Sequence, residues 1–321
     1  MRFGILGDAK IARQALRPAI LAAGHEITAI GRRDANAGCD PIWGDVSVKT
    51  YEGLLADSDV DAVYIALPNH LHVPYAIKAL EAGKPVICEK PVALSLDEFG
   101  LLDEAVRRTG IYLYDGYMVR YHPQWEWLRG LDIGERRQLN AHFSYPPQPE
   151  GNIRNKAAWG GGPIWDIGCY CVLSGLMLFD GAPELRSIIK QQDDHLDVEI
   201  SASAQIVFNH KDRRHQQILN LSCSSGMALS QSLHLIGTDG WARLDVPFNP
   251  PEEATARFAL QEKGTRKKDG MLGLGQEVTF APCDHYALMV ADFAKAVEEG
   301  RQADLTQSYQ LTRLLSQMVA A

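Results

Sequence analysis

Short apolar runs alternate with longer amphipathic stretches over the first third of the chain. The apolar runs predict strands over residues 2–6, 26–30, 61–67, 85–88 and 111–114. Apolar residues at helical spacing predict helices over residues 11–23, 72–82 and 96–109. Strands that alternate with helices are typical of right-handed βαβ units, in which the strands lie parallel. The first part of the chain is therefore expected to be an α/β domain with a doubly wound parallel sheet.

From about residue 136 the pattern changes to consecutive strands. They are predicted over residues 138–145, 185–190, 200–208, 217–223, 230–236 and 241–246. Short polar turns join several of them, which is typical of antiparallel sheets. Further helices are predicted over residues 163–179, 286–298 and 305–319. We therefore expect residues 1–119 to form the parallel α/β domain. Residues 120–321 are expected to form an α+β domain, a largely antiparallel open sheet with helices on one face.

Composition and charge exclude several classes of protein. The 32 Lys and Arg residues against 40 Asp and Glu residues give a net charge of −8, whereas nucleic-acid binding needs a basic surface. The longest apolar-leaning run without charge, residues 167–179, is shorter than the roughly 20 residues of a membrane span. The first residues lack the apolar core of a signal peptide. Six cysteines without a CxxC pair indicate neither a disulfide scaffold nor a zinc site. We expect a cytoplasmic protein that binds neither nucleic acid nor membrane.

The turn after the first predicted strand reads G-D-A-K-I-A over residues 7–12. In the dinucleotide fingerprint G-x-G-x-x-[GA], the first glycine makes the turn, the second lets the pyrophosphate approach and the third packs helix against strand. Ala9 replaces the second glycine and adds a methyl group where the cofactor would approach. An ordinary strand-to-helix turn would look similar. If the turn belongs to a Rossmann domain, the residues against the cofactor are Gly7, Asp8, Ala9, Lys10 and Ile11.

The second predicted strand is followed by Arg32 and Arg33. In dinucleotide folds an acidic residue at this position binds the ribose 2′-hydroxyl of NAD, and an arginine accommodates the 2′-phosphate of NADP. Both guanidinium groups offer charge-assisted donors to a phosphate. The alternative is a pair of solvated surface arginines. The sequence favours NADP as cofactor, with NAD as the second choice.

Two segments carry candidate catalytic groups. Lys90, in the run E-K-P, follows the strand over residues 85–88 and is placed at the carboxyl edge of the sheet; the alternative is a solvated strand-end lysine. A second run, G-G-G-P-I-W-D-I-G-C-Y, places Asp166 and Tyr170 four residues apart on one helix face. A carboxylate in an apolar stretch is costly without partners. The ordinary alternative is a helix-capping aspartate and a tyrosine packed in the core.

These motifs occur together in a fixed order. On the turn at Gly7, the run P-N-H-L-H over residues 68–72, the run E-K-P at Lys90 and the segment 160–170, the chain resembles one family of NAD(P)-dependent oxidoreductases. It is the glucose–fructose oxidoreductase / inositol dehydrogenase / MocA family, and the resemblance covers nearly the whole chain. Segments 118–124 and 152–154 resemble most the branch of NADP-dependent aldose (xylose-type) dehydrogenases and dimeric dihydrodiol dehydrogenase.

The resemblance implies a role for each matching residue. Lys90, Asp166 and Tyr170 would be catalytic, and Arg154 would bind substrate together with Asp166 and Tyr170. Tyr170 would act as general base in oxidation and general acid in reduction, because a nearby Lys90 ammonium lowers a tyrosine pKa that is ordinarily about 10. Besides the turn and the arginines, the residues implied to contact the cofactor are Leu67, Pro68, Asn69, His72, Glu89 and Lys90.

The expected function is NADP-dependent hydride transfer between the nicotinamide and a hydroxyl-bearing carbon of a sugar or polyol. Oxidation of an aldose at its anomeric carbon is the preferred form. The alternatives are a dihydrodiol dehydrogenase, a deoxy- or anhydro-sugar reductase, and a cofactor-binding sensor or scaffold without turnover. The resemblance also implies a homodimer or homotetramer built through the C-terminal sheet.

Two polar segments have a different interpretation. His195, Asp197 and Glu199 alternate and could present one strand face to a divalent ion, but a solvated strand face is favoured and no metal is expected. The stretch over residues 250–275 is polar and contains the basic run 266–268. It is expected to be an exposed excursion, not a nucleic-acid site.

Overall fold

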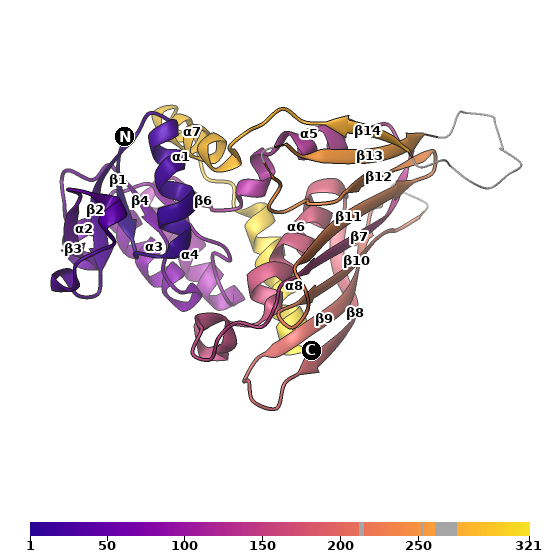
Figure 1. The fold of residues 1–321 in the computed structure, drawn as a ribbon, viewed down its shortest axis with the longest axis horizontal. Helices are drawn as coiled ribbons and strands as arrows, with labels where there is room; N and C mark the ends of the chain where they lie inside the picture. Colours follow the sequence, from indigo (N-terminus) through magenta and orange to yellow (C-terminus); the bar gives the residue numbers. More distant parts are fainter. Residues whose placement is uncertain (212–214, 252, 261–274) are drawn as a thin grey trace, which may run out of the picture. The chain divides into compact units, whose positions relative to one another are not determined.

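The computed structural model describes residues 1–211, 215–251, 253–260 and 275–321 (Figure 1). The chain divides into two compact units. The first comprises residues 1–121 and 284–312, and the second comprises residues 122–283 and 313–321. Helix α7 (His285–Glu298) thus belongs to the first unit although it lies near the C-terminus, and helix α8 (Thr306–Ala320) begins in the first unit and ends in the second.

The first unit is built on a six-stranded sheet in the order β3-β2-β1-β4-β5-β6. Its strands are β1 (Arg2–Leu6), β2 (Glu26–Arg32), β3 (Ser47–Thr50), β4 (Ala62–Ile65), β5 (Val86–Cys88) and β6 (Leu113–Asp115). All neighbouring pairs are parallel. The connecting helices are α1 (Arg17–Ala22), α2 (Tyr51–Leu55), α3 (His72–Glu81) and α4 (Leu96–Thr109). Because β1 lies between β2 and β4, the chain leaves it in two directions, and the expected doubly wound Rossmann sheet is confirmed.

The sequence of the central strands explains their place in the core. Every residue of β4 is buried, and the apolar side chains of β1 are almost fully buried as well. Continuous apolar strands are typical of parallel sheets covered on both faces. Each fully buried side chain of this size contributes roughly 1.5–3 kcal/mol to folding, so the core holds the strand ends in fixed positions.

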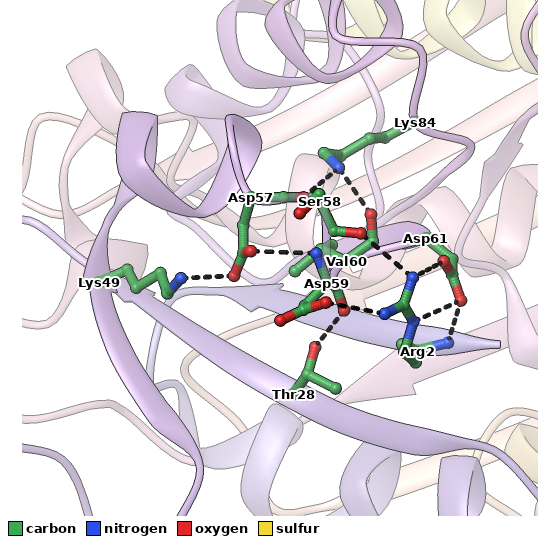
Figure 2. Close-up of polar contacts among 9 residues, drawn as sticks. All are labelled: Arg2, Thr28, Lys49, Asp57, Ser58, Asp59, Val60, Asp61 and Lys84. Carbon is green, nitrogen blue, oxygen red and sulfur yellow. Dashed lines mark hydrogen bonds and ion pairs between the residues drawn. The ribbon is translucent and has the colours of Figure 1, made fainter.

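A polar cluster joins the loop over residues 57–61 to the amino ends of β1 and β5 (Figure 2). The Arg2 guanidinium donates to the Asp61 carboxylate at 2.7 and 3.2 Å and to Asp59 at 3.0 Å. Lys84 is buried, and its ammonium donates to two loop carbonyls at 2.8 and 2.6 Å. Lys49 binds Asp57 at 2.5 Å. We call these six side chains the amino-edge cluster: Arg2, Lys49, Asp57, Asp59, Asp61 and Lys84.

The second unit is built on an eight-stranded sheet in the order β14-β13-β12-β11-β7-β10-β9-β8. Its strands are β7 (Arg136–Ser144), β8 (Ala182–Gln192), β9 (Glu199–Asn209), β10 (Gln217–Ser224), β11 (Ser230–Gly237), β12 (Gly240–Leu244), β13 (Thr255–Leu260) and β14 (Gln276–Thr279). Among its neighbouring pairs only β7 and β10, as far as the structure describes them, run parallel. The expected largely antiparallel open sheet is confirmed.

Strict alternation along β7 gives this sheet one apolar and one polar face. Leu139, Ala141 and Phe143 are buried, whereas Asn140 and His142 are only partly buried. Helix α6 (Cys169–Leu178) packs on the apolar side against β7 and β10 (Figure 1), and α5 (Pro123–Gly130) precedes β7 along the chain. The stretch Ala157–Leu178 is long and apolar enough to span a membrane, but its most apolar part is 83% buried inside the protein, as in the core helix of a globular domain.

Several elements differ from the sequence predictions. Strand β3 and helix α2 were not predicted, because both are short and carry polar residues. Two expected helices begin as π-helical segments, Ala12–Leu16 and Ile164–Gly168. The expectation that residues 250–275 form an exposed excursion is wrong in part, since residues 256–260 of β13 pair with β12. The basic run 266–268 lies outside the residues that the structure describes.

Candidate functional site

The carboxyl edge of the parallel sheet gathers most of the predicted cofactor residues. Strands β2, β1, β4 and β5 are successive neighbours in the sheet, so the segments that follow them meet at one edge. These segments are Arg32 and Arg33, the turn at residues 7–11, Leu67 to Asn69, and Glu89 with Lys90. Ligands of doubly wound sheets bind at this edge, near the switch point, which here is β1.

The turn after β1 has the backbone that a dinucleotide fingerprint requires. Gly7 has φ +100°, and a Cβ atom there would lie 2.6 Å from the carbonyl oxygen of Ala66, so only glycine fits. Its amide donates to the carbonyl of Gly31 at 3.0 Å. Ala9 has an ordinary backbone, since only glycines among the described residues have positive φ. Ala9 therefore causes no backbone strain, and its methyl group affects only how closely a ligand can approach the turn. The residues present fit a dinucleotide.

Asp8, inside this turn, is the centre of a charged network. Its carboxylate, 10% exposed, accepts from the Trp43 indole and the Arg13 guanidinium at 2.8 Å each and from the Asp40 amide at 3.2 Å. The Arg32 guanidinium lies 3.6 Å from its second oxygen. Burial alone would raise the pKa of Asp8, but the hydrogen bonds from Trp43 and Arg13 outweigh it and lower the pKa. Asp8 is therefore ionised at neutral pH.

Of the two predicted arginines, only Arg32 makes contacts of this kind. Its guanidinium donates to the carbonyl of Gly38 and pairs with Asp8, whereas Arg33 is exposed. Arg13, which the sequence did not single out, brings a further guanidinium to the same place and also pairs with Asp40 at 3.4 Å. No periodicity or motif shows that Arg13, five residues after Asp8, turns back toward its carboxylate.

Lys90 stands on a loop that other residues hold in place. The Glu89 carboxylate accepts from the Tyr64 hydroxyl and, at 3.2 Å, from the Lys90 amide. Burial, together with the charge of Glu89, raises the pKa of Tyr64, so this phenol remains a donor. The Lys90–Pro91 peptide is cis. Lys90 itself is half-buried at the carboxyl edge, where the sequence predicts a catalytic lysine.

His72 is placed differently from the cofactor contact that the resemblance implies. Its side chain is fully buried, with one ring nitrogen 2.7 Å from the carbonyl oxygen of Pro91 and the other 2.8 Å from that of Leu67. The two carbonyl oxygens favour the protonated ring, but burial outweighs them and lowers the pKa of His72, so the neutral ring donates to one of the two carbonyls. Because both ring nitrogens face backbone, His72 joins the loops after β4 and β5 and presents no ring atom to a cofactor. That expectation is corrected here.

In the second unit the predicted substrate residues form a compact group. Asp166 lies on the π-helical segment Ile164–Gly168, and its carboxylate accepts from the Arg154 guanidinium at 2.6 Å. The carboxylate is 14% exposed and the guanidinium 43% exposed. The neighbouring Asp166 carboxylate is the main cause of a raised pKa of Arg154. The phenols of Tyr145 and Tyr170 also contribute, so both lie near the guanidinium. Tyr145, directly after β7, was missed by the sequence analysis.

Tyr170 follows in the first turn of α6 and is buried. Its ring packs against Phe143, with centroids 5.9 Å apart, and against Phe248 at 5.6 Å. Aromatic packing of this kind fixes the ring of a tyrosine and leaves its hydroxyl as the chemical group. The π-helical turn between Asp166 and Tyr170 widens the helix at this point, and such turns are frequent at functional sites.

The glycine-rich loop before Asp166 is required by close backbone packing. A Cβ atom on Gly161 would lie 2.6 Å from the carbonyl oxygen of Arg154, and one on Gly162 would lie 2.6 Å from the Glu199 carboxylate. That carboxylate also accepts from the amide of Ile164 at 3.2 Å. The glycines and Glu199 therefore hold the loop that positions Asp166.

The alternating acids of the possible metal-binding face also bind backbone. Asp197 accepts from the amide of Ala157 at 3.0 Å, as Glu199 does from Ile164. Strand β9 begins only at Glu199, so His195 and Asp197 do not share a strand face with it. Burial raises the pKa of Glu199. These residues support the loop that carries the predicted substrate group.

The predicted catalytic residues are thus divided between the units. Lys90 lies with the fingerprint turn and Arg32 at the carboxyl edge of the first unit. Asp166 and Tyr170 lie with Arg154 in the second unit. Within each unit the residues that the sequence assigned to one task lie close together.

Known proteins resemble both units. Residues 1–117 match the oxidoreductase family with an NAD-binding Rossmann fold, and residues 125–243 match the GFO/IDH/MocA C-terminal domain. An uncharacterized oxidoreductase of Rhizobium meliloti is 34% identical over 308 residues, covering 94% of this chain and 90% of that protein. D-xylose 1-dehydrogenase (NADP(+)) 2 of Haloferax volcanii is 31% identical over 324 residues, covering 98% and 95%.

A solved structure agrees with these matches. The crystal structure of a 3-ketoreductase from Actinomadura kijaniata in complex with NADP and TDP-benzene has a TM-score of 0.85 to this chain at 26% identity, covering 98% of this chain and 95% of that one. The resemblance drawn from the sequence motifs and the predicted enzyme class are both confirmed. The chain belongs to the GFO/IDH/MocA family of oxidoreductases, with an NAD-binding Rossmann domain at its N-terminus.

Proposed function

We propose that the protein is an NADP-dependent oxidoreductase that moves a hydride between the nicotinamide and a hydroxyl-bearing carbon of a sugar or polyol. The observation that carries the proposal is the Arg154–Asp166 pair at 2.6 Å, beside a buried Tyr170 on the same helical segment. An acid–base phenol next to a paired carboxylate and guanidinium suits a polyhydroxylated substrate. The xylose dehydrogenase of Haloferax volcanii is named for NADP(+), and the 3-ketoreductase structure contains NADP. Both support NADP over NAD as the cofactor.

In the proposed reaction, Tyr170 takes the proton of the substrate hydroxyl in oxidation and returns it in reduction. Asp166 accepts a hydrogen bond from a neighbouring substrate hydroxyl, and Arg154 holds Asp166 in position. Lys90 is the third catalytic residue that the family resemblance implies, and it carries a positive charge at the carboxyl edge of the first unit. When bound, the nicotinamide supplies the hydride acceptor or donor, and the protein supplies position and charge.

The cofactor would lie along the carboxyl edge of the first unit. The amides of Asp8 to Ile11 would face its phosphates, and Arg32 and Arg33 would face the 2′-phosphate. Leu67 to Asn69, Glu89 and Lys90 would line the remaining length, with His72 supporting the loops from behind. Residues 1–119 would then serve as the cofactor domain and residues 120–321 as the substrate domain.

Tyr170→Phe tests the catalytic part of this proposal, because it removes one hydroxyl from a packed ring. We expect kcat to fall about 10²- to 10⁴-fold, while the Kd of NADP⁺ and the melting temperature stay near wild type. Tyr75→Phe, on α3, removes a hydroxyl that contacts Glu52 at 3.5 Å and serves as the matched control. A Tyr170→Phe enzyme that keeps more than a third of its turnover contradicts the proposed role.

Two substrate classes fit the same site. The preferred one is a free aldose oxidised at its anomeric carbon, as the name of the Haloferax relative suggests. The other is a nucleotide-linked keto sugar, because the solved 3-ketoreductase structure contains TDP-benzene. Competition with dTDP separates them: it should inhibit a nucleotide-sugar reductase and leave an aldose dehydrogenase unaffected. A turnover assay with a trans-dihydrodiol tests the dihydrodiol dehydrogenase alternative. A non-catalytic sensor would turn over neither the sugars nor the dihydrodiol.

We also propose that the protein is cytoplasmic and assembles as a homodimer or homotetramer through the polar face of the second sheet. Side chains of three strands are joined there by hydrogen bonds of 3.0 Å, from Gln205 to Asn220 and from Asn220 to Asn140. A flat face with ordered polar groups suits a self-complementary interface. A solution mass equal to one 35.5 kDa chain at micromolar concentration would contradict the assembly.

A further inference from the structure

The network around Asp8 brings opposite charges to the place where NADP and NAD differ. Arg32 follows β2 at the end where the 2′-substituent of the adenosine ribose is expected, and Asp8 lies 3.6 Å from it. Arg13 binds the same carboxylate at 2.8 Å and Asp40 at 3.4 Å. Two carboxylates and two guanidinium groups therefore form a chain of ion pairs, Arg32–Asp8–Arg13–Asp40, and their charges sum to zero.

We infer that Asp8 is a specificity-determining residue that limits the preference of the enzyme for NADP over NAD. The inference rests on the proposed function, in which Arg32 faces the 2′-substituent. Asp8 then acts on both cofactors in opposite directions. It repels the 2′-phosphate of NADP, and it offsets the positive charge of Arg32, with which it forms an ion pair at 3.6 Å. For NAD, the same carboxylate can accept a hydrogen bond from the neutral 2′-hydroxyl.

The position of the charge makes this effect specific to the 2′-substituent. The Asp8 side chain is 10% exposed, so solvent and salt screen its charge less than that of a surface carboxylate. In most NAD-binding Rossmann domains the selecting carboxylate stands at the end of the second strand. Here that position is basic, and the carboxylate comes from the fingerprint turn after β1 instead.

Asp8 also has a structural task, because it accepts from the Trp43 indole and from the amide of Asp40. These two contacts hold the loop after β2. Loss of a purely structural anchor would weaken both cofactors alike or, by displacing Arg32, weaken NADP more, so the ratio of the NAD⁺ Kd to the NADP⁺ Kd would stay or fall. Loss of a charge that selects raises this ratio, and the ratio is therefore the readout.

The experiment is calorimetric titration of the full-length protein with NADP⁺ and with NAD⁺. The variants are Asp8→Asn and Asp8→Ser, which remove the charge, and Asp8→Glu, which keeps it. We expect the ratio of the NAD⁺ Kd to the NADP⁺ Kd to rise about tenfold in the first two and to stay near wild type in Asp8→Glu. Asp45→Asn, an exposed residue of the same loop, removes one charge without touching the arginines and should leave the ratio unchanged.

An unchanged or lowered ratio in both Asp8→Asn and Asp8→Ser overturns the inference. The double variant Arg32→Ala/Arg33→Ala, titrated in parallel, reports on the proposed cofactor site itself. If it loses the preference for NADP⁺ while the Asp8 variants keep the wild-type ratio, the site stands and the inference about Asp8 fails. If the double variant keeps the preference, the proposed role of the arginines fails, whatever the Asp8 variants show.

Discussion

Strand β5 has a lysine near each end, and their surroundings give them different tasks. Lys84 precedes the strand, is buried, and donates to the carbonyls of Asp57 and Val60 at 2.8 and 2.6 Å. Lys90 follows the strand and is half-buried, and the loop around it is held by Glu89 and by the contact of His72 with Pro91. At the amino edge the lysine charge holds the backbone. At the carboxyl edge other groups hold the backbone around the lysine.

The same contrast applies to the guanidinium–carboxylate networks at the two edges. In the amino-edge cluster, Arg2 and Asp61 tie the loop before β4 to β1 (Figure 2). At the carboxyl edge, Asp8, Arg13 and Arg32 surround the fingerprint turn. The residue types are alike, so charge chemistry alone does not identify a functional site. The end of the parallel strands at which a network lies separates a stabilising cluster from a candidate binding site.

The largest effect is expected from Lys90→Ala. Loss of the ammonium should lower kcat by about 100-fold or more, since the proposed reaction uses Lys90 as a catalytic group, while the protein still binds NADP⁺. Steady-state turnover and NADP⁺ titration on the same preparation measure both quantities. Turnover within threefold of wild type would remove Lys90 from the mechanism and favour a sensor or scaffold.

Lys84→Ala should do the reverse. It removes a buried donor from two carbonyls, and we expect the free energy of unfolding to fall by roughly 1–3 kcal/mol, with kcat of the folded protein unchanged. Thermal or denaturant unfolding gives the first value. Lys78→Ala is the control, because Lys78 pairs with Glu52 on the surface, where both side chains are about half exposed or more, and such pairs contribute little. Equal losses of unfolding free energy in Lys84→Ala and Lys78→Ala would contradict the structural role assigned to the buried Lys84.

His72 and the carboxylates of the amino-edge cluster should lose their contributions to stability in different pH ranges. The pKa of His72 is lowered by burial, so the unfolded chain binds this proton more readily, and stability falls as the pH drops below about 6.5. The pKa values of Asp57 and Asp61 are lowered by hydrogen bonds from Lys49 and Arg2. The stability that they contribute is present above about pH 4 and is lost as the pH falls further.

This difference is tested by melting temperatures measured at about pH 7.5, 5.5 and 3.5, which lie on either side of the two titration ranges. His72→Gln should reduce the loss between the first two, and Asp61→Asn should reduce the loss between the last two. If His72→Gln leaves the upper step unchanged, the buried histidine does not titrate with folding. If Asp61→Asn alters the upper step, the contributions of Asp61 and His72 are not separate in pH.

The smallest effect is expected from Arg2→Ala. The Arg2 side chain is 40% exposed and its partners Asp59 and Asp61 are 75% and 38% exposed, so screening by solvent weakens the pairs. The melting temperature should fall slightly, and the difference from wild type should shrink as salt is added. A difference that persists at high salt would mean that the backbone contacts of Arg2 matter more than its charge.

Local signals were enough for part of this molecule. The fingerprint turn was readable because Gly7 needs a positive φ, and the doubly wound sheet followed from alternating apolar runs. The grouping of Arg154 with Asp166 was also anticipated, from the family resemblance. Three glycines in a row before Asp166 are a local signal of close backbone packing, and the structure shows the partners, Arg154 and Glu199.

Other features depend on contacts that no local pattern reveals. Asp8 meets residues 13, 32, 40 and 43 only after the loop behind β2 has folded over the turn. The burial of His72 depends on two loops that are joined in space, and Arg13 contacts Asp8 across a five-residue separation that belongs to no motif. Strand β13 was missed because its short T-A-R-F-A-L sequence lies inside a stretch, residues 250–275, that is polar as a whole.

The central claim, that the carboxyl edge of the first unit binds NADP through Arg32 and Arg33, is tested most directly by one titration. NADP⁺ and NAD⁺ are titrated into the wild-type protein, into Arg32→Ala/Arg33→Ala and into Arg2→Ala at the opposite edge. The account predicts tighter binding of NADP⁺ by the wild type, a preference lost in the double variant and kept in Arg2→Ala. Equal binding of the two cofactors by the wild type, or a preference that survives in the double variant, would contradict it.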